Sequence, residues 1–191
     1  MNLIQRFNQL DHRLLDVLQE SLRHPWLDRI LTAVTHLGDL GAIWALWGVA
    51  LFWVQRQQSL LLILAISLCA LVCNLVMKPL FRRGRPFEYS REVDVLIAEP
   101  KDRSFPSGHT MASFTAAVLI CTQLGGWQAA LALTLALLIA LSRLYLGVHY
   151  PSDVLAGAVF GSVLGAAVPP LFADLAVSTM KRQLKSRISQ H

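Results

Sequence analysis

Three short polar segments, each beside an apolar run, hold the residue types that could carry out chemistry. Residues 78–86 read KPLFRRGRP, residues 106–109 read PSGH, and residues 142–153 read SRLYLGVHYPSD. Together they combine several cations with two histidines and a carboxylate. Cations bind phosphoryl oxygens, and a histidine paired with a carboxylate can act on phosphorus. The segments therefore predict a phosphate-bearing substrate, held at the edge of a membrane.

The two histidines stand at the starts of two different predicted helices. His149 and Asp153 are four residues apart, so the carboxylate can accept a proton from one ring nitrogen and leave the other free to attack. His109 could protonate a leaving oxygen. A single histidine is more often structural than catalytic, so the prediction depends on both rings facing one ligand.

Three cations adjoin the apolar runs and could bind the phosphate. Arg143 lies inside an apolar helix, where a charge costs about 3 kcal/mol on insertion scales and so needs a partner. Lys78 and Arg85, taken alone, could equally extend toward lipid headgroups. Ser107 and Gly108 have small side chains, so we expect their backbone N–H groups to reach an anion at a helix start.

The composition places these segments in a membrane protein. Hydrophobic residues make up 54% of the 191 residues and charged residues only 15%, against about 25% in soluble domains. We expect an all-α, polytopic membrane helix bundle with about five spanning helices, in a single domain covering residues 1–191. The apolar runs are 26–54, 60–77, 110–124, 127–141 and 154–173. Two crossings separate the 78–109 and 143–153 segments, so both should lie on one side of the membrane.

The regions outside the apolar runs have distinct patterns. Residues 1–23 repeat apolar side chains at helical spacing, which predicts an amphipathic helix in the membrane interface, or one packed on the bundle. A break is expected at His24–Pro25. Residues 78–107 form a polar loop on the catalytic side, and we expect most of its charges to be solvated. Residues 178–191 form a basic C-terminal tail.

The last apolar run carries two signals for helix packing. Gly157, Gly161 and Gly165 recur at every fourth position, a pattern that permits close approach of another helix. The pair Pro169–Pro170 should kink or end the helix near its far end.

The polar segments resemble the phosphatidic acid phosphatase type 2 superfamily, membrane lipid phosphatases that share their site with the vanadium haloperoxidases. The family pattern is K-x6-RP, then PSGH, then SR-x5-H-x3-D. The matching residues here are Lys78, Arg85, Pro86, Pro106, Ser107, Gly108, His109, Ser142, Arg143, His149 and Asp153. The haloperoxidases are soluble, and the apolar runs set this chain apart from them.

The resemblance implies a role for each matching side chain. His149 would attack phosphorus and form a phosphohistidine, with Asp153 orienting it and His109 acting as general acid. The phosphate would be bound by Lys78, Arg85, Ser107, Gly108 and Arg143. No metal and no cofactor is implied, because no paired carboxylates accompany the motifs.

The resemblance is greatest to the small bacterial undecaprenyl pyrophosphate phosphatases, through the short length, the charged N-terminal segment and the sequence Arg85-Pro86-Phe87. Some of those enzymes carry an aspartate in place of Gly108. Phosphatases of phosphatidylglycerophosphate, phosphatidic acid or lipid A, a lipid phosphotransferase, and a non-catalytic lipid-binding or transport subunit stay open. The expected partners are a phosphorylated lipid and the bilayer, and not nucleic acid, because no basic run interleaves with aromatic residues.

The orientation in the membrane is argued from charge. Most of the 17 Lys and Arg residues fall on the side of the motifs, which the positive-inside rule would make cytoplasmic. The phosphate-binding cations inflate that count, whereas the basic cluster at 181–187 has no such role and favours a cytoplasmic C-terminus. The resemblance likewise implies a multi-pass protein of the bacterial inner membrane, with its site facing the periplasm.

Overall fold

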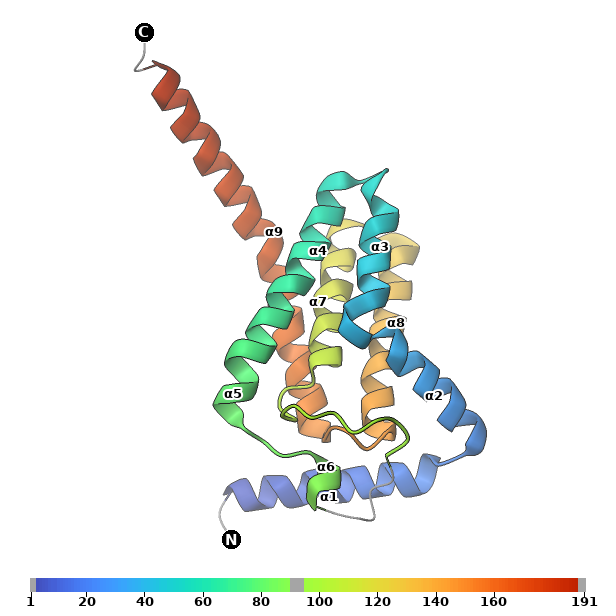
Figure 1. The fold of residues 1–191 in the computed structure, drawn as a ribbon. Helices are drawn as coiled ribbons and strands as arrows, with labels where there is room; N and C mark the ends of the chain where they lie inside the picture. Colours follow the sequence, from blue (N-terminus) through green and yellow to red (C-terminus); the bar gives the residue numbers. More distant parts are fainter. Residues whose placement is uncertain (1–2, 90–94, 189–191) are drawn as a thin grey trace.

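The computed structural model describes residues 3–89 and 95–188, with side chains from 8 to 89 and from 95 to 173. All regular structure in these residues is helical, which confirms the all-α prediction. The elements are α1 (Leu3–Leu22), α2 (Pro25–Leu37), η1 (Asp39–Gly41), α3 (Ala42–Phe52), α4 (Arg56–Leu71), η2 (Val72–Met77), α5 (Lys78–Phe81), α6 (Pro86–Tyr89), α7 (Gly108–Gln123), α8 (Gly126–Tyr145) and α9 (Pro151–Ile188). Helices α3, α4, α7, α8 and α9 form a bundle, and α1 lies across one end of it (Figure 1). The assignment of residues 1–191 to one domain stays a prediction.

Fewer helices than expected are long and apolar enough to cross a membrane. Among the described residues three qualify: Arg56–Tyr89, Gly126–Tyr145 and Pro151–Ala173. A fourth is obtained if Pro25–Leu37 and Asp39–Phe52, which are bent by 47°, count as one span. The remaining expected span, α7, has 16 residues, below the roughly 20 that a typical bilayer requires. Because α7 packs against α4, α8 and α9, its neighbours rather than lipid surround most of it.

The first apolar run, residues 26–54, is broken where we expected one continuous helix. Helix α2 ends at Leu37, and a single 3₁₀ turn, η1, separates it from α3. Within this turn Leu40 has φ 53° and Gly41 has φ 72°, both in the left-handed region. Gly38 precedes this turn and Gly41 ends it, and these two glycines permit the bend, although the apolar spacing continues through it.

Helix α1 packs on the bundle and also presents an apolar strip for the membrane interface, so it combines the two arrangements proposed for residues 1–23. The predicted break holds, since α1 ends at Leu22 and α2 begins at Pro25. Leu15 is fully buried against the bundle. Leu10 and Val17, on another flank, are 55% and 59% exposed, which leaves an apolar strip suited to the lipid–water boundary.

The glycine repeat lets α9 lie directly against α7. A Cβ atom at Gly157 would come within 2.8 Å of the Ser107 carbonyl oxygen, and one at Gly165 within 2.5 Å of the Thr115 carbonyl oxygen. At Gly161 a Cβ would collide with the backbone of Met111. The prediction of close helix approach is therefore confirmed, and it brings the N-terminal ends of α7 and α9 together.

Gly161→Ala should therefore destabilise the bundle. The added methyl group meets backbone atoms of α7, so the two helices must separate, at a cost of about 1–3 kcal/mol. Thermal unfolding in detergent measures the effect. Ala166→Ser is the matched control, because it adds one heavy atom on an exposed position of the same helix. Equal unfolding temperatures for the two variants would contradict the proposed packing.

The proline pair does not end the last helix. We expected a kink or an end at Pro169–Pro170; α9 continues through both to Ile188, so the second alternative is wrong. Within the predicted 178–191 tail, the backbone is helical as far as Ile188, and residues 189–191 lie outside the described part. The predicted polar loop at 78–107 contains the short helices α5 and α6, and residues 90–94 of it lie outside the described residues.

Candidate active site

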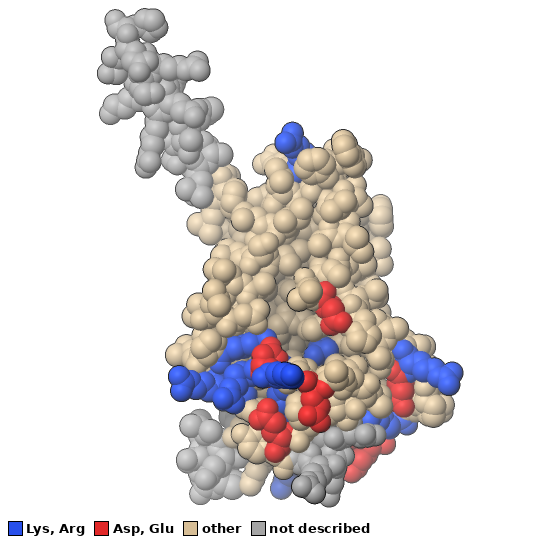
Figure 2. All heavy atoms as spheres, in the orientation of Figure 1, with Lys and Arg blue, Asp and Glu red and all other residues tan. Residues whose placement is uncertain are grey.

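The predicted site residues converge at the end of the bundle that carries α1. In Figure 2 the charged side chains gather at this end, and the bundle above it is almost free of them. A cavity of about 390 Å³ opens here between segments that are far apart in the sequence. Its lining includes Lys78, Arg85, Gly108, His109, Arg143 and His149. Both predicted segments therefore lie at one end, and both histidines face one space, as expected.

His149 is buried and is paired with Asp153 behind it. Its Nδ1 atom lies 3.6 Å from Asp153 Oδ2. The same carboxylate oxygen accepts hydrogen bonds from Ser104 Oγ at 2.5 Å and from the Tyr150 N–H at 2.9 Å. The opposite ring atom, Nε2, lies 3.3 Å from an Arg85 nitrogen, on the cavity side. The predicted histidine–aspartate pair is thus present, with Nε2 on the cavity side of the ring.

The environment of His149 favours its neutral form. Burial lowers the pKa of His149 to about 3, assisted by the charges of Arg85 and Arg143 and opposed by the Asp153 carboxylate. At neutral pH the ring therefore has a free lone pair. A neutral imidazole beside cations is suited to attack an electrophile that the cations bind.

Two of the predicted phosphate-binding cations share a carboxylate that the sequence did not single out. Arg85, only 2% exposed, donates to Asp102 Oδ1 at 2.6 Å and to the Val148 carbonyl oxygen at 2.7 Å. Lys78 donates to Asp102 Oδ2 and to Asn74 Oδ1. Burial raises the pKa of Asp102, but Lys78 and Arg85 outweigh this and bring it to about 2. Most of the loop charges were expected to be solvated; the Asp102 side chain is 48% exposed, and it also pairs with both cations.

Arg143 is buried without the acidic partner that its position leads one to expect. It is 2% exposed, and one terminal nitrogen donates to Thr35 Oγ1 at 2.5 Å. Its Nε atom has no hydrogen-bond partner, and Arg143 forms no ion pair, among the residues that the structure describes. A buried cation that lines a cavity without an acidic partner of its own is suited to bind an anion there.

Of the two small residues at the start of α7, Ser107 and Gly108, only one lines the cavity. Gly108 lines it, and a Cβ atom there would lie 3.6 Å from Lys78 Nζ. The Ser107 N–H instead donates to the Asp153 carbonyl oxygen at 3.1 Å, and its hydroxyl accepts a hydrogen bond from Thr110 at 2.9 Å. The expectation that the Ser107 N–H is free for an anion is therefore wrong. Close packing of α7 on α9 consumes this donor.

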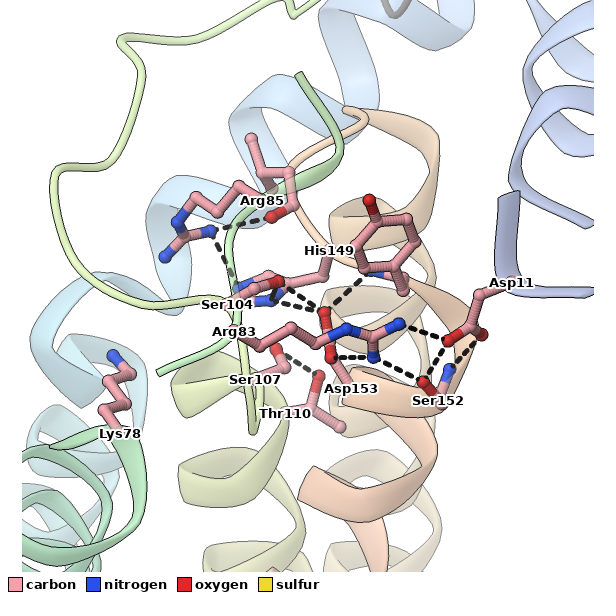
Figure 3. A network of polar contacts seen from close by, with 12 residues as sticks. Asp11, Lys78, Arg83, Arg85, Ser104, Ser107, Thr110, His149, Ser152 and Asp153 are labelled. Carbon is pink, nitrogen blue, oxygen red and sulfur yellow. Dashed lines mark hydrogen bonds and ion pairs between the residues drawn. The ribbon is translucent and has the colours of Figure 1, made fainter. Parts of the chain in front are cut away.

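A second polar network links α1 to the Asp153 carboxylate. Figure 3 shows Arg83 between Asp11 and Asp153. Arg83 donates to Asp153 Oδ1 at 2.7 Å and to Asp11 Oδ2 at 2.6 Å. Asp11 Oδ1 also accepts the Ser152 N–H, in the first turn of α9, at 3.0 Å. Sequence analysis missed this network, although Asp11 falls on the helical face of Leu15, where a carboxylate among apolar residues is a usable signal.

Asp11→Asn should therefore weaken both stability and turnover. Arg83 pairs with two carboxylates, Asp11 and Asp153, and the substitution removes the charge of the first. Asp11 is only 5% exposed. Breaking a buried pair costs about 3–5 kcal/mol, part of which Asn recovers by hydrogen bonding. The variant is compared by thermal unfolding and by turnover with Asp16→Asn, an exposed aspartate on the same helix. If both variants behave as the wild type, the network has no energetic role.

The second histidine of the cavity has a carboxylate partner of its own. His109 Nε2 lies 2.8 Å from Asp39 Oδ1, and Asp39 Oδ2 lies 2.7 Å from His36 Nδ1. Asp39 belongs to η1, at the break in the first apolar run, residues 26–54. No cluster of three or more potential metal ligands of the His, Cys, Asp or Glu type occurs within residues 3–89 and 95–188.

Comparison with known proteins agrees with this geometry. An undecaprenyl-diphosphatase of Sulfolobus acidocaldarius is 36% identical over 109 residues, which are 56% of this chain and 53% of that protein, so the match spans about half of the relative. The crystal structure of a transmembrane PAP2-type phosphatidylglycerolphosphate phosphatase from Bacillus subtilis has a TM-score of 0.72 and 28% identity, covering 91% of this chain and 88% of that one. Aquifex aeolicus LpxE has a TM-score of 0.73 and 32% identity, covering 82% and 92%. Residues 58–175, which contain every predicted site residue, match the family model described as PAP2 superfamily, and the chain belongs to that superfamily.

Proposed function

We propose that this protein is an integral membrane lipid phosphatase that transfers the phosphoryl group to His149 and then to water. The observation that carries the proposal is the shared cavity, in which both histidines face the buried Arg143 with its unused donor. Family membership supports the same reaction class. Phosphoryl transfer depends mainly on positioning and charge stabilisation, which such a cavity provides.

The reaction would proceed in two steps. His149 Nε2 forms a bond to phosphorus while the bond from phosphorus to the leaving oxygen breaks, and His109 gives that oxygen a proton. Water then attacks the phosphohistidine, the nitrogen–phosphorus bond breaks, and His109 takes a proton from the water. Asp153 holds the His149 ring and stabilises its positive charge.

The phosphoryl oxygens would be bound on three sides. Lys78 and Arg85 face them across the position that Asp102 occupies, and Arg143 approaches from α8. The Gly108 backbone lies at the positive end of α7, which favours an anion. The Ser107 hydroxyl can join this set only if it turns away from Thr110.

We propose undecaprenyl pyrophosphate as the substrate, with undecaprenyl phosphate and inorganic phosphate as products. The similarity to the undecaprenyl-diphosphatase of Sulfolobus acidocaldarius supports this choice. A second cavity, of about 260 Å³, shares Lys78, Asp102, Gly108 and His109 with the first. Its other walls include Leu40, Ile66, Cys69 and Ala112, an apolar surface on which the first units of a lipid chain could lie. The phosphatidylglycerolphosphate phosphatase structure keeps that glycerolipid as the second candidate.

A panel of lipid phosphates tests this proposal. Purified protein in detergent is assayed for phosphate release from undecaprenyl pyrophosphate, phosphatidylglycerophosphate, phosphatidic acid and lipid A, with His149→Ala as the inactive control. We expect release to be fastest from the isoprenoid diphosphate and unchanged by EDTA. Transfer of labelled phosphate to a second lipid instead of water would indicate a phosphotransferase, and binding of all four lipids without release would indicate a non-catalytic protein.

We propose the bacterial inner membrane as the location, with the cavity facing the periplasm. The basic cluster at 181–187 supports a cytoplasmic C-terminus. A single cysteine placed at the exposed Glu99 position, beside the cavity, tests this orientation in cells. It should react with a membrane-impermeant maleimide before lysis, and labelling only after lysis would place the site in the cytoplasm.

A further inference from the structure

The break between α2 and α3 contains a residue in a strained backbone conformation. Leu40 adopts φ 53°, which side chains other than glycine rarely take, and its side chain is fully exposed. An exposed leucine gains no packing from this conformation. Strained backbone of this kind persists where surrounding structure requires it, often at functional sites.

What the break accomplishes is the placement of Asp39. Asp39 precedes Leu40 in the chain, and its Oδ1 atom lies 2.8 Å from His109 Nε2. Gly38 lies so close that a Cβ atom there would come within 2.9 Å of the His109 ring. Neither approach is compatible with α2 continuing straight into α3.

Asp39 is itself fixed from the other side. Its second oxygen lies 2.7 Å from His36 Nδ1, on the last turn of α2. The two oxygens of one carboxylate are thus shared between His36 and His109. This arrangement orients Asp39 while leaving His36 largely exposed.

The contact determines what His109 can offer to a substrate. A carboxylate accepts the Nε2–H, so Nδ1 is the ring atom left for a ligand in the cavity. The groups that share the cavity with His109 are His36, Asp39, Lys78, Arg85, Glu99, Asp102, Arg143 and His149. Burial, Arg143 and Lys78 oppose a positive charge on the ring, and the hydrogen-bonded Asp39 carboxylate favours one.

We propose that Asp39 is the positioning residue of the general acid: it fixes the His109 tautomer and stabilises the protonated ring that delivers a proton to the leaving oxygen. The inference rests on the proposed function. It concerns a residue outside the matched 58–175 region, so the family pattern does not contain it.

The test compares two leaving groups on one lipid. An isoprenyl monophosphate releases a strongly basic alkoxide, which needs a proton, whereas the corresponding diphosphate releases a weakly basic phosphate monoester. Asp39→Asn should lower kcat about 10- to 100-fold for the monophosphate, but less than about 3-fold for the diphosphate, with little change in KM. Asp16→Asn, which alters an exposed aspartate on α1, is the matched control and should leave both rates unchanged.

Two further measurements keep the proposal testable if Asp39→Asn does not fold. His36→Gln removes only the outer support of Asp39 and should give the same preference for the diphosphate, in weaker form. Nitrogen NMR of wild-type protein, with the His109 signals assigned through His109→Gln, should show the neutral ring protonated at Nε2. This readout does not depend on activity, so it separates failure of this inference from failure of the proposed function.

Equal losses on both substrates would assign Asp39 a merely structural role. A neutral His109 protonated at Nδ1 would overturn the inference directly. If the wild-type protein hydrolyses neither lipid but shows the Nε2 tautomer, the positioning stands and the proposed function fails.

Discussion

The substitution His149→Asn is expected to reduce turnover on the order of 10⁵-fold while the protein remains folded. Asparagine cannot form the phosphoryl intermediate, but its amide can still donate to Asp153, so the buried carboxylate keeps a partner. The loss should be in kcat, because the cations that bind the phosphate remain in place. Turnover and thermal unfolding in detergent measure the two halves of this prediction.

A labelling experiment shows whether the loss is chemical. Wild-type protein mixed with ³²P-labelled lipid phosphate and quenched rapidly in alkali should retain label on protein, and the label should be released by acid. His149→Asn should retain none. His24→Asn is the matched control, because His24 caps α2 by accepting the Trp26 N–H and asparagine fills the same role. Activity retained in His149→Asn, or label on another residue, would contradict the mechanism.

The residues that line the cavity and are proposed to act on phosphate could be predicted because each is conspicuous where it stands. His149, Arg143 and Lys78 are polar groups at the ends of, or inside, apolar runs, where a polar side chain requires a reason. The even number of crossings between the two segments placed them at one end. Local sequence patterns are therefore sufficient to find candidate site residues when these are polar residues in apolar surroundings.

Two supporting residues, Asp102 and Arg83, could not be predicted, because nothing in their surroundings distinguishes them. Asp102 lies among other charges in the polar loop, and Arg83 lies in an arginine-rich stretch. Their pairing arises only when α1, the loop and α9 are assembled. The break at Leu40 was missed for a related reason, since the apolar spacing of a spanning helix continues through it.

Asp102 also indicates the order in which the site is filled. Its carboxylate pairs with both Lys78 and Arg85, so these two cations carry little unpaired charge. Arg143 has no such carboxylate among the described residues. An incoming phosphate therefore gains most from Arg143, and it must share or displace Asp102 to reach the other two cations.

The second large effect is therefore expected for Arg143→Met. Loss of the buried guanidinium should lower kcat/KM about 10²- to 10³-fold, comparable to the loss of a donor to a developing charge. Inhibition by orthovanadate, which resembles the phosphoryl group in transfer, should weaken at the same time. Arg143→Lys should recover part of the binding, because it restores the charge but not the planar set of donors.

The same substitution should not destabilise the protein. A buried charge with no acidic partner is costly, and replacing it with an apolar side chain of similar volume is neutral or stabilising by about 1–4 kcal/mol. Arg29→Met, at an exposed position on α2, serves as the control for both measurements. An Arg143→Met protein that unfolds more easily would show that the arginine supports the fold. One that keeps its affinity for vanadate would show that the anion binds elsewhere.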